Sequence, residues 1–193
     1  MKLDTRLVYG LIVCVLLISA PHAGHLPLWV SSLSAVLLGW RAWLAYSNQL
    51  LPPRWLLLAV VAGITGGILI SFHTLFGREA GVTLLVLLAA LKLLEMRSAR
   101  DATIVLYLAC FVIITKFFYS QSMLTALLMF ATLLVIVATW VHLQCGTLAL
   151  RPRLRIAGVL LLQAIPLTLI LFLLFPRIPV SYTHLTLPTI LLV

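Results

Sequence analysis

Apolar runs long enough to cross a lipid bilayer recur along almost the whole chain. Two examples are WLLLAVVAGITGGILISF, which starts at Trp55, and LLLQAIPLTLILFLLF, which ends at Phe175. A helix needs about 20 apolar residues to cross about 30 Å of hydrocarbon, and lipid offers the backbone no hydrogen-bond partners. Because these runs are continuous rather than alternating, they favour helices over barrel strands. We therefore predict an all-α fold, a polytopic transmembrane helical bundle.

Composition excludes a soluble domain of ordinary size. Of the 193 residues, 64% are hydrophobic and 9% are charged, whereas a globular chain has about 45–50% apolar and about 25% charged residues. The net charge of +9 does not indicate nucleic-acid binding, because the basic residues form short clusters between the apolar runs instead of one basic face. The lipid bilayer is the partner that this composition predicts.

The apolar runs predict about seven membrane spans. They are Leu7–Ala20, Leu28–Tyr46, Trp55–Phe72, Ala80–Leu94, Ala102–Phe117, Met123–His142 and Ile156–Phe175. The first run is short and follows two basic residues, so it also fits the apolar region of a signal peptide. Six spans remain if that segment is cleaved or re-entrant.

The distribution of Lys and Arg predicts the orientation. With a cytoplasmic N-terminus, ten basic residues fall on the cytoplasmic side: Lys2, Arg6, Arg41, Arg54, Lys92, Arg97, Arg100, Arg151, Arg153 and Arg155. Three fall on the other side, Arg78, Lys116 and Arg177. Since cytoplasmic loops carry the excess of basic residues, we expect a cytoplasmic N-terminus and an extracytoplasmic C-terminus.

Four ionisable residues in the fourth run are candidates for function. Arg78 and Glu79 open that run, where the helix dipole favours Glu79 by about 0.3–1 kcal/mol and Arg78 can extend to the interface. A polar site at the outer membrane face is the alternative interpretation. Lys92 and Glu95 are three residues apart and share one helix face. We predict an ion pair between them, with a role in transport or lipid-headgroup binding as the alternative.

Further residues have a structural interpretation. Ser98 and Asp101 fit a helix-capping pattern before the fifth run, while Arg97 lies at the cytoplasmic surface. The G-x-x-x-G spacings of Gly63 with Gly67 and of Gly77 with Gly81 predict close helix packing. Pro166 is expected to bend the seventh span.

No metal, cofactor or catalytic residue is predicted in this chain. The three cysteines, Cys14, Cys110 and Cys145, are far apart and have no metal-ligand spacing. A metal site from His22, His25 and His73 would require a convergence that the sequence does not indicate.

Three segments resemble a known family. They are FGREAGVTLLVLLAALKLLEMRSARDA, FFYSQS and LLLQAIPLTLILFLLFPRIP, and together they are similar to the N-terminal membrane region of bacterial TgpA-type transglutaminase-like proteins. The resemblance covers roughly Trp55 to Pro179. It implies a protein-glutamine γ-glutamyltransferase-like parent in the bacterial inner membrane, whose Cys-His-Asp catalytic domain is extracytoplasmic. That domain is missing here, so the resemblance assigns no catalytic residue to this sequence.

The last residues follow a different pattern. VSYTHLTLPT, residues 180–189, matches one reading frame of a common tagmentation sequencing adapter, at the point where the family resemblance stops. We therefore interpret 1–179 as the integral membrane domain and 180–193 as read-through rather than a native domain.

Together these observations predict a membrane-anchoring N-terminal domain of a transglutaminase-like protein, which positions the missing catalytic domain near envelope substrates. Two alternatives stay open. One is a small transporter or channel that uses Lys92 and Glu95. The other is a membrane-embedded site that acts on lipid-linked envelope precursors.

Overall fold

A computed structural model describes residues 4–47, 49, 51–73, 77–146 and 148–175. These residues form seven α-helices and one short 3₁₀ turn, with no β-strand among them, which confirms the predicted all-α class. The elements are α1 (Thr5–Ser19), η1 (Ala20–His22), α2 (Leu28–Tyr46), α3 (Arg54–Phe72), α4 (Arg78–Glu95), α5 (Ala99–Lys116), α6 (Met123–Cys145) and α7 (Leu150–Leu174). The predicted read-through segment, 180–193, lies outside the described residues.

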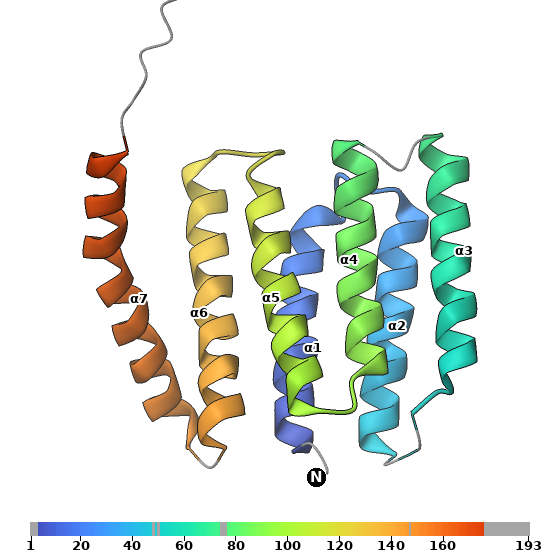
Figure 1. The fold of residues 1–193 in the computed structure, drawn as a ribbon, viewed down its shortest axis with the longest axis horizontal. Helices are drawn as coiled ribbons and strands as arrows, with labels where there is room; N and C mark the ends of the chain where they lie inside the picture. The colour runs from blue at the N-terminus through green and yellow to red at the C-terminus, as the bar shows by residue number, and fades with distance from the viewer. Residues whose placement is uncertain (1–3, 48, 50, 74–76, 147, 176–193) are drawn as a thin grey trace, which may run out of the picture.

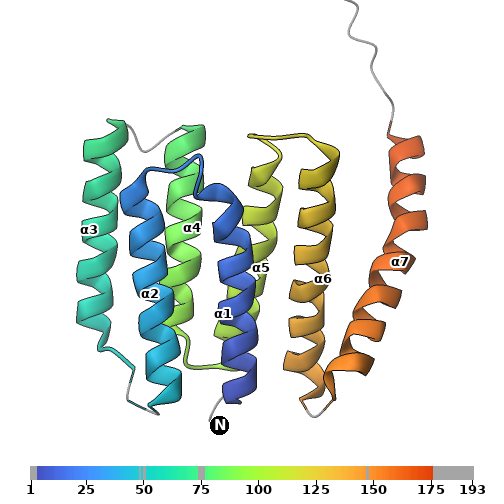
Figure 2. The same cartoon turned by 180° about the vertical axis from the view of Figure 1, so that it is seen from behind.

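Successive helices run up and down and form two partial layers. In Figure 1, α4 and α5 lie in front of α1 and α2, and Figure 2 shows the reverse face. Helix α3 lies at one edge of the bundle, while α6 and then α7 extend the other edge. Helix α4 packs against α1, α2, α3 and α5, and α1 also packs against α5 and α6. The first span, predicted to be short, is therefore central to the bundle.

The alternation gives the bundle two ends. The amino-terminal end holds the start of α1 and the connections α2–α3, α4–α5 and α6–α7 (Figure 1). The carboxy-terminal end holds η1, the connections α3–α4 and α5–α6, and the last residues of α7.

Burial is concentrated in α4 and α5 and decreases toward the edges. Leu87, Leu93 and Leu94 of α4 are 0% exposed, and the small residues Ala89 and Ala90 on the same helix let its neighbours approach closely. On α7, by contrast, Ala157 alone among the described residues is buried, while Leu173 is 82% exposed. The bundle therefore has a packed centre and an apolar outer surface, as expected of helices in lipid rather than in water.

Five of the helices are long and apolar enough to cross a membrane. They are α1 together with η1, α2, α3, α6 and α7. Helices α4 and α5 are not among them, since each carries more than two charged side chains in 18 residues. Those charges lie in the first and last turns of the two helices, and the residues between them are apolar or small. Composition thus supports five of the seven predicted spans.

The glycine and proline predictions have different outcomes. A Cβ atom at Gly67 would lie 3.3 Å from the Trp29 ring of α2, so this glycine does allow close packing. A Cβ atom at Gly63 or Gly81 would meet no atom within 4 Å in the described structure, so the spacing alone was misleading there. Gly77 precedes α4 as its N-cap and has extended backbone, so it is not on a helical face. Helix α7 continues through Pro166, and its two halves run in different directions in Figure 1.

Candidate functional site at the ends of the helix bundle

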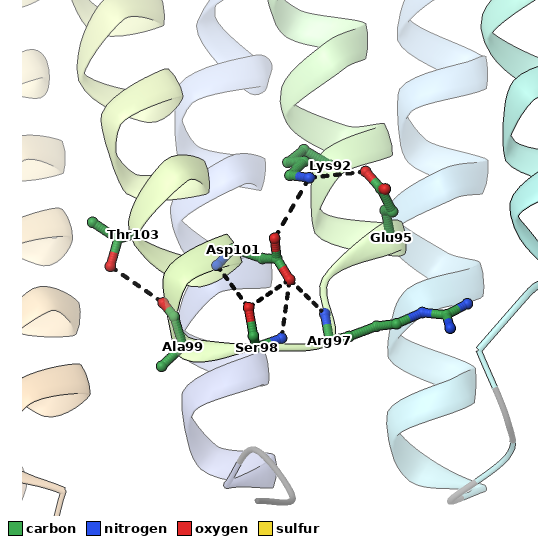
Figure 3. A network of polar contacts seen from close by, with 7 residues as sticks. All are labelled: Lys92, Glu95, Arg97, Ser98, Ala99, Asp101 and Thr103. Carbon is green, nitrogen blue, oxygen red and sulfur yellow. Dashed lines mark hydrogen bonds and ion pairs between the residues drawn. The ribbon is translucent and has the colours of Figure 1, made fainter.

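Four of the predicted polar residues meet at the amino-terminal end, where α4 turns into α5 (Figure 3). Lys92 Nζ lies 2.9 Å from Glu95 Oε2, which confirms the predicted ion pair within α4. The same ammonium lies 3.6 Å from Asp101 Oδ1 of α5, a contact that the sequence did not predict. Lys92 therefore pairs with one carboxylate of its own helix and with one of α5, and the second contact links the two helices.

The second oxygen of Asp101 closes a capping box at the start of α5. Oδ2 accepts hydrogen bonds from the backbone N–H groups of Arg97 at 3.2 Å and Ser98 at 3.0 Å, and from the Ser98 hydroxyl at 2.8 Å. The Asp101 N–H in turn donates to Ser98 Oγ at 3.2 Å. These bonds confirm the predicted cap. The Ser98 hydroxyl, then the two backbone amides and Lys92, hold the pKa of the Asp101 carboxyl below its usual range.

Two arginines tie this end to neighbouring helices through backbone carbonyls. Arg41 of α2, only 6% exposed, donates from Nε to the Leu93 carbonyl at 3.0 Å, near the end of α4. Arg97 donates from Nη2 to the Pro52 carbonyl at 3.1 Å. In both bonds a cation donates to a carbonyl at or near a helix end. The Leu93 carbonyl is near the C-terminus of α4, where the helix dipole attracts a positive charge. The sequence pattern placed Arg41 only on the cytoplasmic side, and the charge inside the apolar run GWRAW was the signal that it faces inward.

One more polar pair lies at the same end. His142 of α6 is 4% exposed, and its Nε2 lies 3.5 Å from Asp4 Oδ2 at the start of α1. Asp4 is the N-cap of α1, and its side chain accepts from the Arg6 N–H at 3.2 Å. Nothing in the sequence pattern indicates this contact of His142.

The carboxy-terminal end holds a second polar group, which we call the Tyr119 cluster: Tyr119, Arg78, Lys116, His22 and His25. Tyr119 follows α5, and its ring stacks on His25 at 4.9 Å and meets the edge of His22 at 6.1 Å. The Arg78 guanidinium lies 5.1 Å from the ring centre, and the Lys116 ammonium lies 6.0 Å from it. No pattern in the sequence singles out Tyr119 as the centre of this cluster.

Hydrogen bonds to carbonyls hold the cations of the cluster in place. Arg78 donates to the Phe118 carbonyl at 3.3 Å, and Lys116 donates to the Pro21 carbonyl at 2.6 Å. Lys116 is only 6% exposed, so this cation is covered by its neighbours rather than open to the surroundings. The His22 ring is fully buried, with Nδ1 2.8 Å from the Ile18 carbonyl and Nε2 3.3 Å from Thr115 Oγ1. Glu79 lies in the first turn of α4, as predicted.

The remaining candidates do not converge into a further site. In the described part of the chain, no group of three or more His, Cys, Asp or Glu side chains is arranged to hold a metal ion. Cys14 is buried with its sulfur 3.3 Å from Thr139 Oγ1, Cys110 is half-buried, and Cys145 is exposed. Between the two ends, the described helices carry no Asp, Glu, Lys or Arg. The polar contacts hold neighbouring helix ends together. Among the described residues, they do not form a continuous series of charged side chains from one end of the bundle to the other.

Comparison with known proteins identifies the family to which this sequence is similar. The sequence profile of a family described as "TgpA N-terminal domain" matches residues 10–189. The match begins well before Trp55 and also takes in residues 180–189. A protein of Pseudomonas aeruginosa, named "Protein-glutamine gamma-glutamyltransferase", is 35% identical over 170 residues, which are 87% of this chain and 25% of that protein. The chain thus spans about a quarter of the length of this curated relative. No solved structure matches it.

Proposed function

The chain belongs to the TgpA N-terminal domain family, and on that premise we propose that it anchors a transglutaminase-like protein in the bacterial inner membrane. In this proposal the bundle positions an extracytoplasmic Cys-His-Asp catalytic domain, carried by the rest of a longer protein, close to envelope substrates. The activity itself, of the kind named for the P. aeruginosa relative, belongs to that other domain.

The observation that carries the proposal is the location of the polar side chains. They gather at the two ends of the bundle, and many of the large apolar side chains on the outer faces are exposed. On α7 the exposed residues continue for more than six turns, from Leu150 to Leu174. A soluble bundle would gain nothing from such a surface, whereas a membrane solvates it.

All seven helices cross the bilayer in this proposal, including α4 and α5. Their charges lie at helix ends, where side chains reach the headgroup region, and their apolar middles are covered by other helices. A helix in the centre of a bundle needs fewer strongly apolar residues than one that faces lipid. Helix α1 fits the same scheme as a retained helix rather than a cleaved signal peptide, because Leu11 and Cys14 are 0% exposed in the centre.

The distribution of basic residues supports the orientation. Nine described Lys and Arg residues lie at the amino-terminal end: Arg6, Arg41, Arg54, Lys92, Arg97, Arg100, Arg151, Arg153 and Arg155. Two, Arg78 and Lys116, lie at the carboxy-terminal end. By the positive-inside rule the amino-terminal end is cytoplasmic. Helix α7 then ends on the extracytoplasmic side, where a catalytic domain of the parent would act.

Cysteine labelling in intact cells tests this topology. In a variant without native cysteines, single substitutions Gly24→Cys and Gln121→Cys introduce thiols in exposed connections at the carboxy-terminal end. We expect a membrane-impermeant maleimide to label both. Tyr46→Cys and Arg100→Cys, exposed at the amino-terminal end, should be labelled only after permeabilisation. The reverse pattern would overturn the orientation, and labelling of Arg100→Cys in intact cells would show that α4 and α5 do not cross.

The transporter alternative finds no support in the arrangement of charges. Lys92, on which the transporter hypothesis depends, forms ion pairs with Glu95 and Asp101 at one end of the bundle. A polar pathway across the membrane requires ionisable or hydrated groups near the midplane, and the described helices carry no charged side chain there.

A further inference from the structure

Helix α7 has one side that packs on the bundle and one side that faces away from it. Its packing partner is α6, and Ala157 is buried in that contact. Successive residues of a helix are about 100° apart, so Gln163, six residues later, lies about 240° around the helix from Ala157. Gln163 is exposed on the side that faces away from α6. A hollow of about 540 Å³ borders the same side, and its lining belongs to α7: Pro152, Arg155, Ile156, Val159, Leu160 and Gln163.

The exposed side chains on this side of α7 follow a heptad pattern. From Ile156 onward, apolar residues recur at alternating steps of four and three, and Gln163 takes one of these positions. Such a pattern is typical of a helix that packs along its length against a second helix in a left-handed pair. We call this set of exposed residues the α7 seam: Ile156, Leu160, Gln163, Leu167, Ile170 and Leu174.

Gln163 is the polar member of the α7 seam, and it is a second, independent indication of a missing helix. Its amide can both donate and accept hydrogen bonds, yet it makes none to a described residue. Thr168 is the other polar side chain of α7 after Arg155. The Thr168 hydroxyl is satisfied inside the helix, because it donates to the Ala164 carbonyl at 2.8 Å. Since lipid offers no hydrogen-bond partner, the Gln163 amide near the middle of a spanning helix is costly until another protein group pairs with it.

The chemistry of the amide favours a second copy of the same chain as the partner. Copies inserted in one membrane with the same orientation bring their α7 helices together in parallel. A two-fold axis along the membrane normal then places each seam residue opposite itself. The partial charges of one Gln163 amide complement those of the other, because each NH₂ group can donate to the oxygen of its counterpart. A single polar residue within an apolar heptad seam also fixes the register and the number of chains.

The bend of α7 keeps like charges apart in such a pair. In Figure 1 and in Figure 2, the second half of α7 lies at the outer edge of the bundle, whereas its first half slants toward α6. Two copies that meet along the second half therefore separate toward the arginines at the start of α7, which are Arg151, Arg153 and Arg155. The closest contact then runs from Gln163 to Leu174.

We propose that the chain forms a parallel homodimer in the membrane through the α7 seam, with two Gln163 amides hydrogen-bonded to each other at its centre. The inference rests on the proposed membrane location and adds a self-association surface to the anchoring role. In a longer protein, the dimer holds the segments that follow α7 in two chains side by side at one membrane face.

Cysteine crosslinking in membranes locates the contact. In a variant without native cysteines, Leu167→Cys and Ile170→Cys each place a thiol on the α7 seam. The thiols are oxidised with copper-phenanthroline, and dimers are separated on a non-reducing gel. The matched control is Ile165→Cys: Ile165 is also exposed, but two residues in a helix are about 200° apart, so it lies on the other side from Leu167. We expect dimers from both seam variants and several-fold less from the control.

Sedimentation equilibrium of the purified chain in density-matched detergent micelles measures the strength of association. Gln163→Leu keeps the α7 seam apolar and removes the amide pair, and we expect about three- to tenfold weaker association. Gln163→Asn retains an amide and should lose less. The matched control is Thr168→Val, which removes a hydroxyl that is already bonded within its own helix; it should change association by less than about twofold.

Three results would overturn the dimer. They are crosslinking at Ile165→Cys as strong as at Leu167→Cys, a chain that is monomeric in membranes and in micelles, or equal association of Gln163→Leu and the unmodified chain. A monomeric chain would leave the α7 seam to another helix of a longer protein. The proposed function fails separately, if the unmodified chain does not fractionate with membranes, whereas the dimer fails if an inserted chain stays monomeric or pairs through another face.

Discussion

Replacing Asp101 by alanine should destabilise the bundle far more than replacing Glu95, although both carboxylates contact Lys92. The Asp101 Oδ2 atom accepts from two backbone amides and one hydroxyl, while Oδ1 faces Lys92 at 3.6 Å. Glu95 makes a single contact, its ion pair with Lys92 at 2.9 Å. The difference tests whether this network exists to cap α5 or to hold charges.

The expected magnitudes follow from these contacts. Loss of a helix cap costs about 0.5–2 kcal/mol, typically about 1, and a partly exposed ion pair adds less than about 1 kcal/mol. The side chains of Lys92 and Asp101 are 26% and 21% exposed, so solvent screens their attraction only in part. We therefore expect Asp101→Ala to lower the free energy of unfolding by about 2 kcal/mol. Glu95→Ala removes one pair between residues three apart and should cost about 0.2–0.5 kcal/mol.

Equilibrium unfolding in mixed micelles, followed by circular dichroism, measures both variants. Asp101→Asn is the matched control, because an amide keeps one acceptor oxygen for the backbone and loses the charge. It should cost about half as much as Asp101→Ala. The reasoning is refuted if Glu95→Ala is as costly as Asp101→Ala, or if Asp101→Asn costs as much as the alanine variant.

Three other predictions concern pH, glycine packing and burial. The lowered pKa of Asp101 contributes stability above the ordinary aspartate pKa of about 3.9. That stability is lost as the pH falls through the lower folded value, so the stability gap between Asp101 and Asp101→Asn should close in acid unfolding curves. Gly67→Leu should cost about 1–3 kcal/mol by displacing Trp29, whereas Gly63→Leu, which faces open space, should not destabilise the bundle; thermal unfolding in detergent compares them. Leu87→Ala in the centre of α4 should cost about 2–5 kcal/mol, and Leu173→Ala, 82% exposed, less than about 0.5 kcal/mol in the same assay. Equal costs would contradict the placement of α4 inside and α7 outside.

Helix positions could be predicted well because each helix coincides with an apolar run. The predicted span Leu28–Tyr46 is α2 without change, and Trp55–Phe72 differs from α3 by one residue. The largest difference is at α7, which begins at Leu150 rather than Ile156. The prediction located the strongly apolar stretch, whereas the helix also includes Arg151, Arg153 and Arg155. The length of an apolar run depends on which side chains avoid water, whereas the length of a helix depends on how far the backbone hydrogen bonds continue.

Local polar contacts were also within reach of sequence reasoning. Lys92 with Glu95 and Ser98 with Asp101 are both three residues apart, and the geometry of a single helix end decides whether they meet. In contrast, Arg41 reaches the Leu93 carbonyl across 52 residues, and Lys116 reaches the Pro21 carbonyl across 95. Such bonds depend on which helices are neighbours and how they are rotated, and the apolar runs carry little information on either.

The Tyr119 cluster shows why the polar ends of a membrane bundle are harder to predict than its spans. In sequence, Arg78, Lys116 and Tyr119 look like three unrelated interface residues that could each extend into the headgroup region alone. In the bundle, α4 and α5 are adjacent, and the turn after α1 brings His22 and His25 against the same ring. A single basic residue at the carboxy-terminal end is an exception to the positive-inside distribution, in which basic residues concentrate at the other end. The packing of the helices instead brings two cations over one aromatic ring, which none of these residues indicates alone in the sequence.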